Sequence, residues 1–234
     1  MPAAMPQPAI VPPLPTMPVT CRLLNMVSFT EGVRNGEPYE ETDIDELVAN
    51  FDKYNPFTLK GSAPPAMLGM LFDTLLVGNM DEPTTAYGLL AADIAVATDF
   101  KSVVFELRPQ ARFHNGDPVL AADVRHSFER LTSQQAAPQY RTYFGEVKAA
   151  TVLGERSIRF DFVRPNSELP LIVGGMPVFS RHWGEEDGRT KPFDKIVTDT
   201  PIGSGPYKIG RVVFGRDVSY ERDNNYWARD LNVR

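Results

Sequence analysis

The stretch VVFELRPQARFHNGDPVLAADVRHSFERL, residues 103–131, decides the fold expected for this chain. At its start Val103, Phe105 and Leu107 occupy alternate positions, which is the period-2 pattern of a strand with one buried face. Residues 115–118, Asn-Gly-Asp-Pro, predict a turn, because glycine tolerates positive φ and proline presets φ without donating a hydrogen bond. The stretch then predicts a short helix with an apolar stripe at helical spacing: Ala121, Val124, Phe128 and Leu131. The pattern is that of a strand–turn–helix unit in an α/β protein.

Within FELRPQARFHNGDPVLAADVRHSF, a set of aromatic, arginine, turn and helix-start positions forms a recognisable signature: Phe105, Leu107, Arg108, Phe113, Gly116, Pro118, Ala121, Asp123, Val124, Ser127 and Phe128. This signature resembles that of the extracellular solute-binding proteins of peptide-importing ABC transporters, the family 5 peptide/nickel type. Leu120 departs from it, because the family usually carries threonine there. Losing a hydroxyl N-cap is expected to weaken the helix start by about 1 kcal/mol.

Two later segments extend the resemblance in the family's own order. PIGSGPYKI, residues 201–209, is similar to the family's Pro-x-Gly-Thr-Gly-Pro-Tyr segment. YERDNNYWARDLNV, residues 220–233, is similar to its Arg-x-Pro-x-Tyr-Trp segment and points to the branch that imports oligopeptides and microcin-C-like peptides. The resemblance covers about residues 51–234 and ends where family members continue into a second lobe.

The resemblance implies an α/β fold: a partial first lobe of a type II periplasmic-binding-protein fold, built over residues 52–234 around a mixed sheet. Period-2 patterns predict strands at 103–107, 157–163 and 211–220, the last of these as a hairpin. Helical spacing predicts helices at 66–76 and 121–131.

The first 51 residues lie outside this resemblance. Residues 1–20 are rich in proline and read as a disordered, partly polyproline-II tail with no visible secretory signal. Residues 21–51 form a segment of uncertain origin, with a helix expected over 40–53. Residues 28–51 faintly resemble the opening of phage head-maturation proteases. A protease fragment and a non-functional fusion of two unrelated pieces therefore remain as alternatives.

Composition narrows the classes of partner. The chain has 234 residues, 42% of them hydrophobic, and a net charge of −6, which argues against nucleic acid as the main partner. The single cysteine, Cys21, excludes an internal disulfide and a cysteine-based zinc site. His114, His126 and His182 share no metal-site spacing, and a surface position is the simplest interpretation of His126. We therefore expect no catalytic residue, no metal and no cofactor.

Peptide binding needs backbone groups and tyrosines, because a peptide of varied sequence is best held through its main chain. By resemblance, the loop formed by Gly61, Ser62, Ala63 and Pro64 belongs to the lobe that lines the cleft, as do Tyr140 and Tyr143. Ser204 and Gly205 are further candidates for ligand contact. The glycines around Ser204 also suit a conformational role, since they let backbone pass close to a neighbour or a ligand.

The resemblance thus implies a non-enzymatic, substrate-binding component of an ABC peptide importer. Its partners would be an oligopeptide ligand and an ABC permease in the inner membrane, and its location would be the periplasm. Because the resemblance covers one lobe, we expect the chain alone to bind oligopeptides weakly.

Overall fold

The computed structural model describes residues 33–34, 37–38, 51–64, 66–78 and 85–231. The predicted tail at 1–20 and nearly all of the segment at 21–51 lie outside these residues. So does most of the helix predicted over 40–53. Its last three positions, 51–53, are described and are not helical, and Phe51 is buried.

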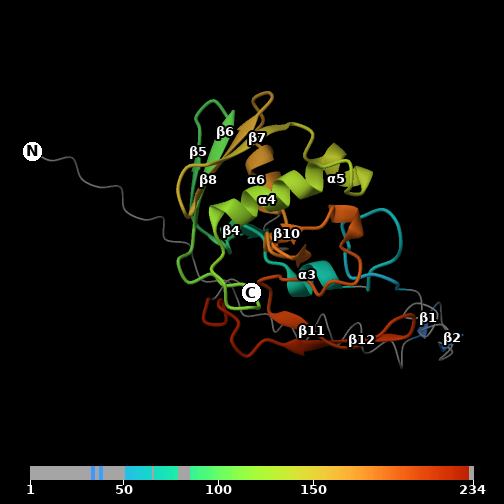
Figure 1. Cartoon of the computed structure of the whole chain (residues 1–234). Coiled ribbons are helices and arrows are strands. Elements are labelled where there is room, and N and C mark those ends of the chain that lie inside the picture. The colour runs from blue at the N-terminus through green and yellow to red at the C-terminus, as the bar shows by residue number, and fades with distance from the viewer. Residues whose placement is uncertain (1–32, 35–36, 39–50, 65, 79–84, 232–234) are drawn as a thin grey trace, which may run out of the picture.

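A four-stranded sheet forms one end of the molecule (Figure 1). Its strands, in spatial order, are β5 (Ala91–Val96), β6 (Ser102–Leu107), β8 (Ser157–Phe162) and β7 (Val147–Val152). The strands predicted at 103–107 and 157–163 are therefore confirmed as β6 and β8. The sheet is not mixed as expected, because every described strand pair is antiparallel. Short turns join β5 to β6 and β7 to β8, and such connections produce antiparallel neighbours.

One face of this sheet is buried, as the alternation predicted. Val103, Phe105 and Leu107 on β6 are buried together with Phe160 on β8, while the residues between them are more exposed. Helix α4 (Ala121–Thr132) packs against β7 and β8, and the Phe128 ring meets Phe160 edge-on at 5.7 Å. All four residues of the predicted helix stripe are buried. The strand–turn–helix unit is thus confirmed, with its strand and helix facing one core.

Leu120 stands at the N-cap of α4 and makes no side-chain cap bond, as its identity implied. Two other contacts satisfy this end of the helix. Asp123 Oδ2 accepts from the Leu120 N–H at 3.0 Å, and the Ala121 N–H donates to the Glu155 carbonyl at 2.9 Å. The β7–β8 turn therefore supplies an acceptor for the first N–H of the helix.

Segments distant in sequence meet in an aromatic cluster beside α4. Phe57 and Phe193 stack with their ring centroids 6.2 Å apart, and Phe179 lies 5.3 Å from Phe57. Trp183 and Phe72 complete the cluster. The short elements in the same part of the chain are α5 (Pro138–Tyr143), α6 (Leu169–Gly174), the strand pair β9 (Glu185–Glu186) and β10 (Arg189–Thr190), and a 3-10 turn (Phe193–Lys195). Aromatic burial thus joins the N-terminal part of the described chain to residues 179–193.

The helix predicted over 66–76 is shorter than expected. Helix α3 spans only Met67–Leu71, and Phe72 is already extended. The chain then runs through the core to β3 (Leu76–Gly78), which pairs with β4 (Ala86–Gly88). Asp73 is fully buried there, and its Oδ2 accepts a hydrogen bond from the Trp227 indole at 2.9 Å. Tertiary contacts have overridden the apolar periodicity that favoured a longer helix.

The hairpin predicted at 211–220 is confirmed and is longer than expected. It consists of β11 (Tyr207–Val213) and β12 (Asp217–Arg222). In Figure 1 this ribbon runs beneath α3, at the end of the molecule away from the four-stranded sheet. A short strand pair, β1 (Val33–Arg34) with β2 (Glu37–Pro38), completes the described elements.

Candidate groove along helix α3

Two surface hollows adjoin at helix α3 and share Leu68 and Gly69 in their lining. The first has a volume of about 420 Å³ and is bordered by the loop that contains Gly61, Ala63 and Pro64. The second, of about 660 Å³, is bordered by α5 and includes Tyr140 and Tyr143. We refer to the two hollows together as the α3 groove. It brings together five of the residues expected to contact ligand, although the loop and α5 are more than 70 positions apart in sequence.

A buried lysine holds the loop of the first hollow in place. Lys53 is only 4% exposed, and its ammonium donates to the Thr58 carbonyl at 2.6 Å and the Lys60 carbonyl at 2.7 Å. A third contact, at 3.1 Å, reaches the Thr58 hydroxyl. Burial lowers the pKa of Lys53, while the neighbouring Asp52 carboxylate opposes this effect. The chain from Thr58 to Lys60 is thereby folded around one cation.

Asp52 fixes the next part of the same loop. Its Oδ1 accepts from the Ser62 N–H at 2.7 Å, and the Ser62 carbonyl accepts from the Asp52 N–H at 3.0 Å. Gly61 sits in this turn with φ of +79°, and a Cβ there would lie 2.4 Å from Asp52 Oδ1. Glycine is therefore required at position 61 by both conformation and space. Ser62 is exposed and serves the turn through its backbone.

The two tyrosines of α5 present different surfaces. Tyr140 is half-buried and meets Phe57 edge-on at 5.7 Å, and burial raises the pKa of its hydroxyl. Tyr143 is 58% exposed and leans on Phe144 with their ring centroids 5.1 Å apart. Tyr140 thus anchors α5 in the core, whereas most of Tyr143 remains available to a ligand.

Backbone strain lies at the start of α3, in the lining of the first hollow. Ala66, the N-cap residue, has φ of +62°, a conformation that costs an alanine about 1 kcal/mol. Strain of this kind concentrates at functional positions, where the surrounding structure enforces it. The conformation directs the chain from the Gly61–Pro64 loop into the helix that separates the two hollows.

Ser204 and Gly205 lie behind α3 and do not line either hollow. The Gly205 N–H donates to the Leu71 carbonyl at 2.9 Å, and His114 Nε2 lies 2.9 Å from the Gly205 carbonyl. A Cβ at Gly205 would stand 2.3 Å from the Met70 carbonyl oxygen. Ser204 is buried, and its carbonyl accepts from the Trp227 indole at 3.1 Å. The close backbone approach matches the conformational role that the glycines suggested.

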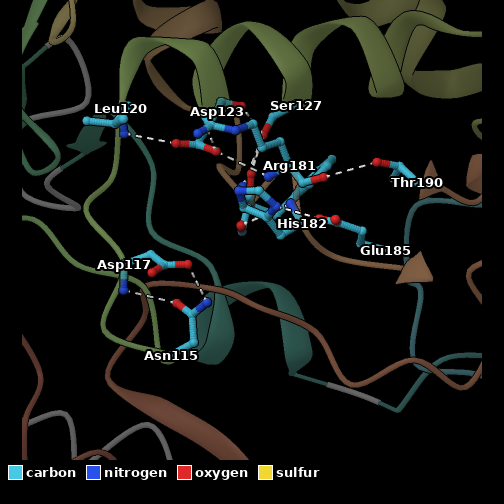
Figure 2. Close-up of polar contacts among 11 residues, drawn as sticks. Asn115, Asp117, Leu120, Asp123, Ser127, Arg181, His182, Glu185 and Thr190 are labelled. Atoms are coloured by element: carbon cyan, nitrogen blue, oxygen red, sulfur yellow. Dashed lines mark hydrogen bonds and ion pairs between the residues drawn. The ribbon is translucent and has the colours of Figure 1, made fainter. Parts of the chain in front are cut away.

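Two polar residues of the family signature, Asp123 and Ser127, lie in a separate cluster at the N-terminal half of α4 (Figure 2). Asp123 Oδ1 accepts from the Arg181 N–H at 3.2 Å and lies 3.7 Å from the Arg181 guanidinium. Ser127 Oγ accepts from the Phe179 N–H at 3.0 Å. Burial raises the pKa of Asp123, against the stabilising backbone donors of Arg181 and Leu120. These residues fasten the 179–181 segment to α4, so their role is to hold the fold.

Sequence reasoning missed several groove residues, among them Lys53, Leu68 and Gln139. One signal was present for Lys53, since a lysine inside the aromatic run FDKYNPF needs partners if the run is buried. His126 is also more enclosed than predicted, because it packs edge-on to Phe179 with the ring centroids 6.2 Å apart. Within the described part of the chain no His, Cys, Asp or Glu cluster suits a metal ion. The same residues contain no helix with the length and apolar character needed to traverse a bilayer.

The arrangement defines a class: an α/β lobe with a surface groove, of the kind found in type II periplasmic binding proteins. Two solved structures share this fold with the chain. DppA from Helicobacter pylori in complex with the peptide STSA superposes with a TM-score of 0.64 at 21% identity, over 77% of this chain and 38% of that one. NikA from Brucella suis in complex with Fe(III)-EDTA gives a TM-score of 0.64 at 22% identity, over 76% and 35%.

Residues 85–233 match the family described as bacterial extracellular solute-binding proteins, family 5 Middle. The chain belongs to this family. It is 38% identical over 187 residues to the probable peptide-binding protein YejA of Agrobacterium fabrum, and 32% identical over 189 residues to the uncharacterized protein YejA of Escherichia coli. These alignments cover 78% and 80% of this chain. The chain spans about 30% of the length of each of these two relatives.

Proposed function

We propose that the protein is the substrate-binding component of an ABC peptide importer, and that an oligopeptide lies in the α3 groove. Family membership supports the solute-binding role. The name of the Agrobacterium relative and the peptide bound to DppA support a peptide as the solute. The partner would be a permease of the inner membrane and the place of action the periplasm, in keeping with a family described as extracellular.

One observation carries the assignment of the site. Residues of the Gly61–Pro64 loop and of α5 border adjoining hollows on either side of α3. The loop offers backbone groups in a shape held by Asp52 and Lys53, and α5 offers a largely exposed tyrosine. Preformed backbone groups and tyrosine faces are the equipment that recognition of a peptide main chain requires.

The test is a titration with short peptides, followed through ligand signals in NMR so that weak binding remains visible. Tyr143→Ala removes an exposed side chain with few core contacts, so the fold should persist while affinity falls by about threefold or more. Leu153→Ala is the matched control, because Leu153 is 55% exposed in the β7–β8 turn and lines neither hollow.

Equal affinity of the wild type and Tyr143→Ala would remove α5 from the site. No binding of any peptide by the wild type, at millimolar concentrations, would contradict the proposed function. If the protein bound a metal chelate and no peptide, its ligand would be of the kind seen in the NikA complex with Fe(III)-EDTA, and the proposed peptide ligand would be wrong.

A further inference from the structure

The described part of the α3 groove lining is almost free of charge. Among the described residues that border the two hollows, Lys53 is the only one whose side chain carries a charge at neutral pH. The others are apolar, glycine or neutral polar residues, including Leu68, which is 44% exposed between the hollows. This pattern is unexpected for a protein with a net charge of −6, in which 23% of the residues are charged.

The single charge is already engaged by the protein. The Lys53 ammonium has three N–H groups, and three oxygens surround it: the Thr58 carbonyl, the Thr58 hydroxyl and the Lys60 carbonyl. Its side chain is buried beneath the loop. A ligand carboxylate would have to displace these partners in order to use the cation, and the loop would then lose the group around which it folds.

Neutral polar groups are available for the ligand backbone. The Gln139 amide and the Tyr140 and Tyr143 hydroxyls border the second hollow and form no hydrogen bonds to other described residues. Such groups can pair with peptide N–H and carbonyl groups, which carry no net charge. They offer no compensation for a buried carboxylate or ammonium, whose desolvation is far more costly than that of an amide.

We propose that the α3 groove takes an uncharged stretch of the peptide, with apolar or aromatic side chains, and that charged side chains and both charged ends lie outside it. The proposal rests on the function proposed above and assigns the ligand chemistry of this part of the site. Apolar side chains would cover Leu68 and the walls of the second hollow, while the amides of the same stretch meet the neutral polar groups.

The first experiment compares N-acetylated, C-amidated tripeptides Ala-Xaa-Ala in which Xaa is Leu, Phe, Glu or Lys. The blocked ends remove terminal charge, so the central side chain is the only variable. The Leu and Phe peptides should bind about tenfold more tightly than the Glu and Lys peptides. Binding of all four with equal affinity would overturn the inference and leave the proposed function standing. Absence of binding by all four, and by unblocked peptides as well, would overturn both.

The second experiment places a charge in the groove. Gln139→Glu should improve binding of the Lys peptide several-fold and weaken binding of the Glu peptide. Gln110→Glu is the matched control, because it changes the net charge equally at an exposed position outside both hollows. Equal effects of the two variants would mean that overall charge acts at long range, and would overturn the inference. A different outcome would be self-association of the wild type, with Leu68→Glu abolishing the association. That result would assign the groove to a second copy of the chain and would also overturn the inference.

Discussion

His126 gives the fold a sensitivity to acid. Its ring is enclosed against Phe179, and Arg130, Arg181 and His182 lie nearby. Burial, followed by these positive neighbours, lowers the pKa of His126 from 6.5 to about 4. In the neutral form the ring accepts a long hydrogen bond from Arg130 Nε, 3.4 Å from His126 Nε2.

The unfolded chain therefore takes up a proton at His126 below about pH 6.5, whereas the folded chain does so only near pH 4. Because the unfolded state binds more protons in this window, the free energy of unfolding falls as the pH is lowered through it. For a partly exposed ring we expect a loss of about 1 kcal/mol between pH 7 and pH 5. Urea denaturation should show a smaller loss for His126→Gln. Identical pH dependence in the two proteins would contradict this account.

A substitution at Gly203 tests how closely the segment 203–205 approaches the backbone of α3. A Cβ at this position would lie 1.8 Å from the Leu71 carbonyl oxygen, and backbone atoms cannot yield as a side chain can. Gly203→Ala should therefore lower the free energy of unfolding by about 3 kcal/mol or more. Gly69→Ala is the control, since no atom lies within 4 Å of its Cβ position and alanine favours the helix by about 0.5–1 kcal/mol. Similar stability of the two variants in thermal unfolding would refute the packing described here.

Single residues were the hardest to predict. The loop residues and tyrosines could be proposed from a family pattern, but nothing in the spacing showed that Lys53 would be the group around which the loop folds. Its role depends on three oxygens of Thr58 and Lys60, which the following turn brings near it, and the sequence pattern did not specify the shape of that turn. The same holds for His126, whose burial comes from Phe179, a residue 53 positions away.

At the scale of elements, Ser127 connects α4 to the segment that follows α6. Its hydroxyl accepts from the Phe179 N–H and lies within hydrogen-bond distance of the Asp123 and Phe179 carbonyls. Ser127→Ala leaves the buried Phe179 N–H without this acceptor, and should cost about 1–3 kcal/mol in chemical denaturation. Ser133→Ala, at the half-exposed end of the same helix, should cost less than about 0.5 kcal/mol, because water can replace its bond to the Arg130 carbonyl. Equal costs would argue against the connection.

Elements governed by local periodicity were predicted well, and those governed by distant contacts were not. The alternation in β6 and β8 and the stripe of α4 describe faces of one core, so the sequence pattern and the burial agree. In α3 an equally regular apolar pattern continues beyond Leu71, yet the chain becomes extended where Asp73 meets Trp227. The antiparallel order of the sheet likewise follows from how its hairpins assemble, which no single segment encodes.

At the scale of the whole molecule, the groove is open to solvent along α3, and this limits the affinity of the 234-residue polypeptide by itself. Water competes for every hydrogen bond to a peptide held on one side only, and ordering the peptide still costs entropy. Isothermal titration against di- to pentapeptides should therefore show no dissociation constant below roughly 100 μM, about 5.5 kcal/mol of binding free energy. A sub-micromolar peptide would refute this limit and identify a more enclosed site.

The contact between Asp73 and Trp227 also has a consequence for the order of events during synthesis. The two residues are 154 positions apart, and the half-buried indole of Trp227 reaches the fully buried carboxylate of Asp73. At roughly 5–20 residues per second, the ribosome needs on the order of ten seconds to add the tryptophan after the aspartate. During that interval the first apolar segments have emerged without the partner that completes their burial. The nascent chain is therefore expected to remain dependent on chaperones until the β11–β12 hairpin and Trp227 have left the exit tunnel.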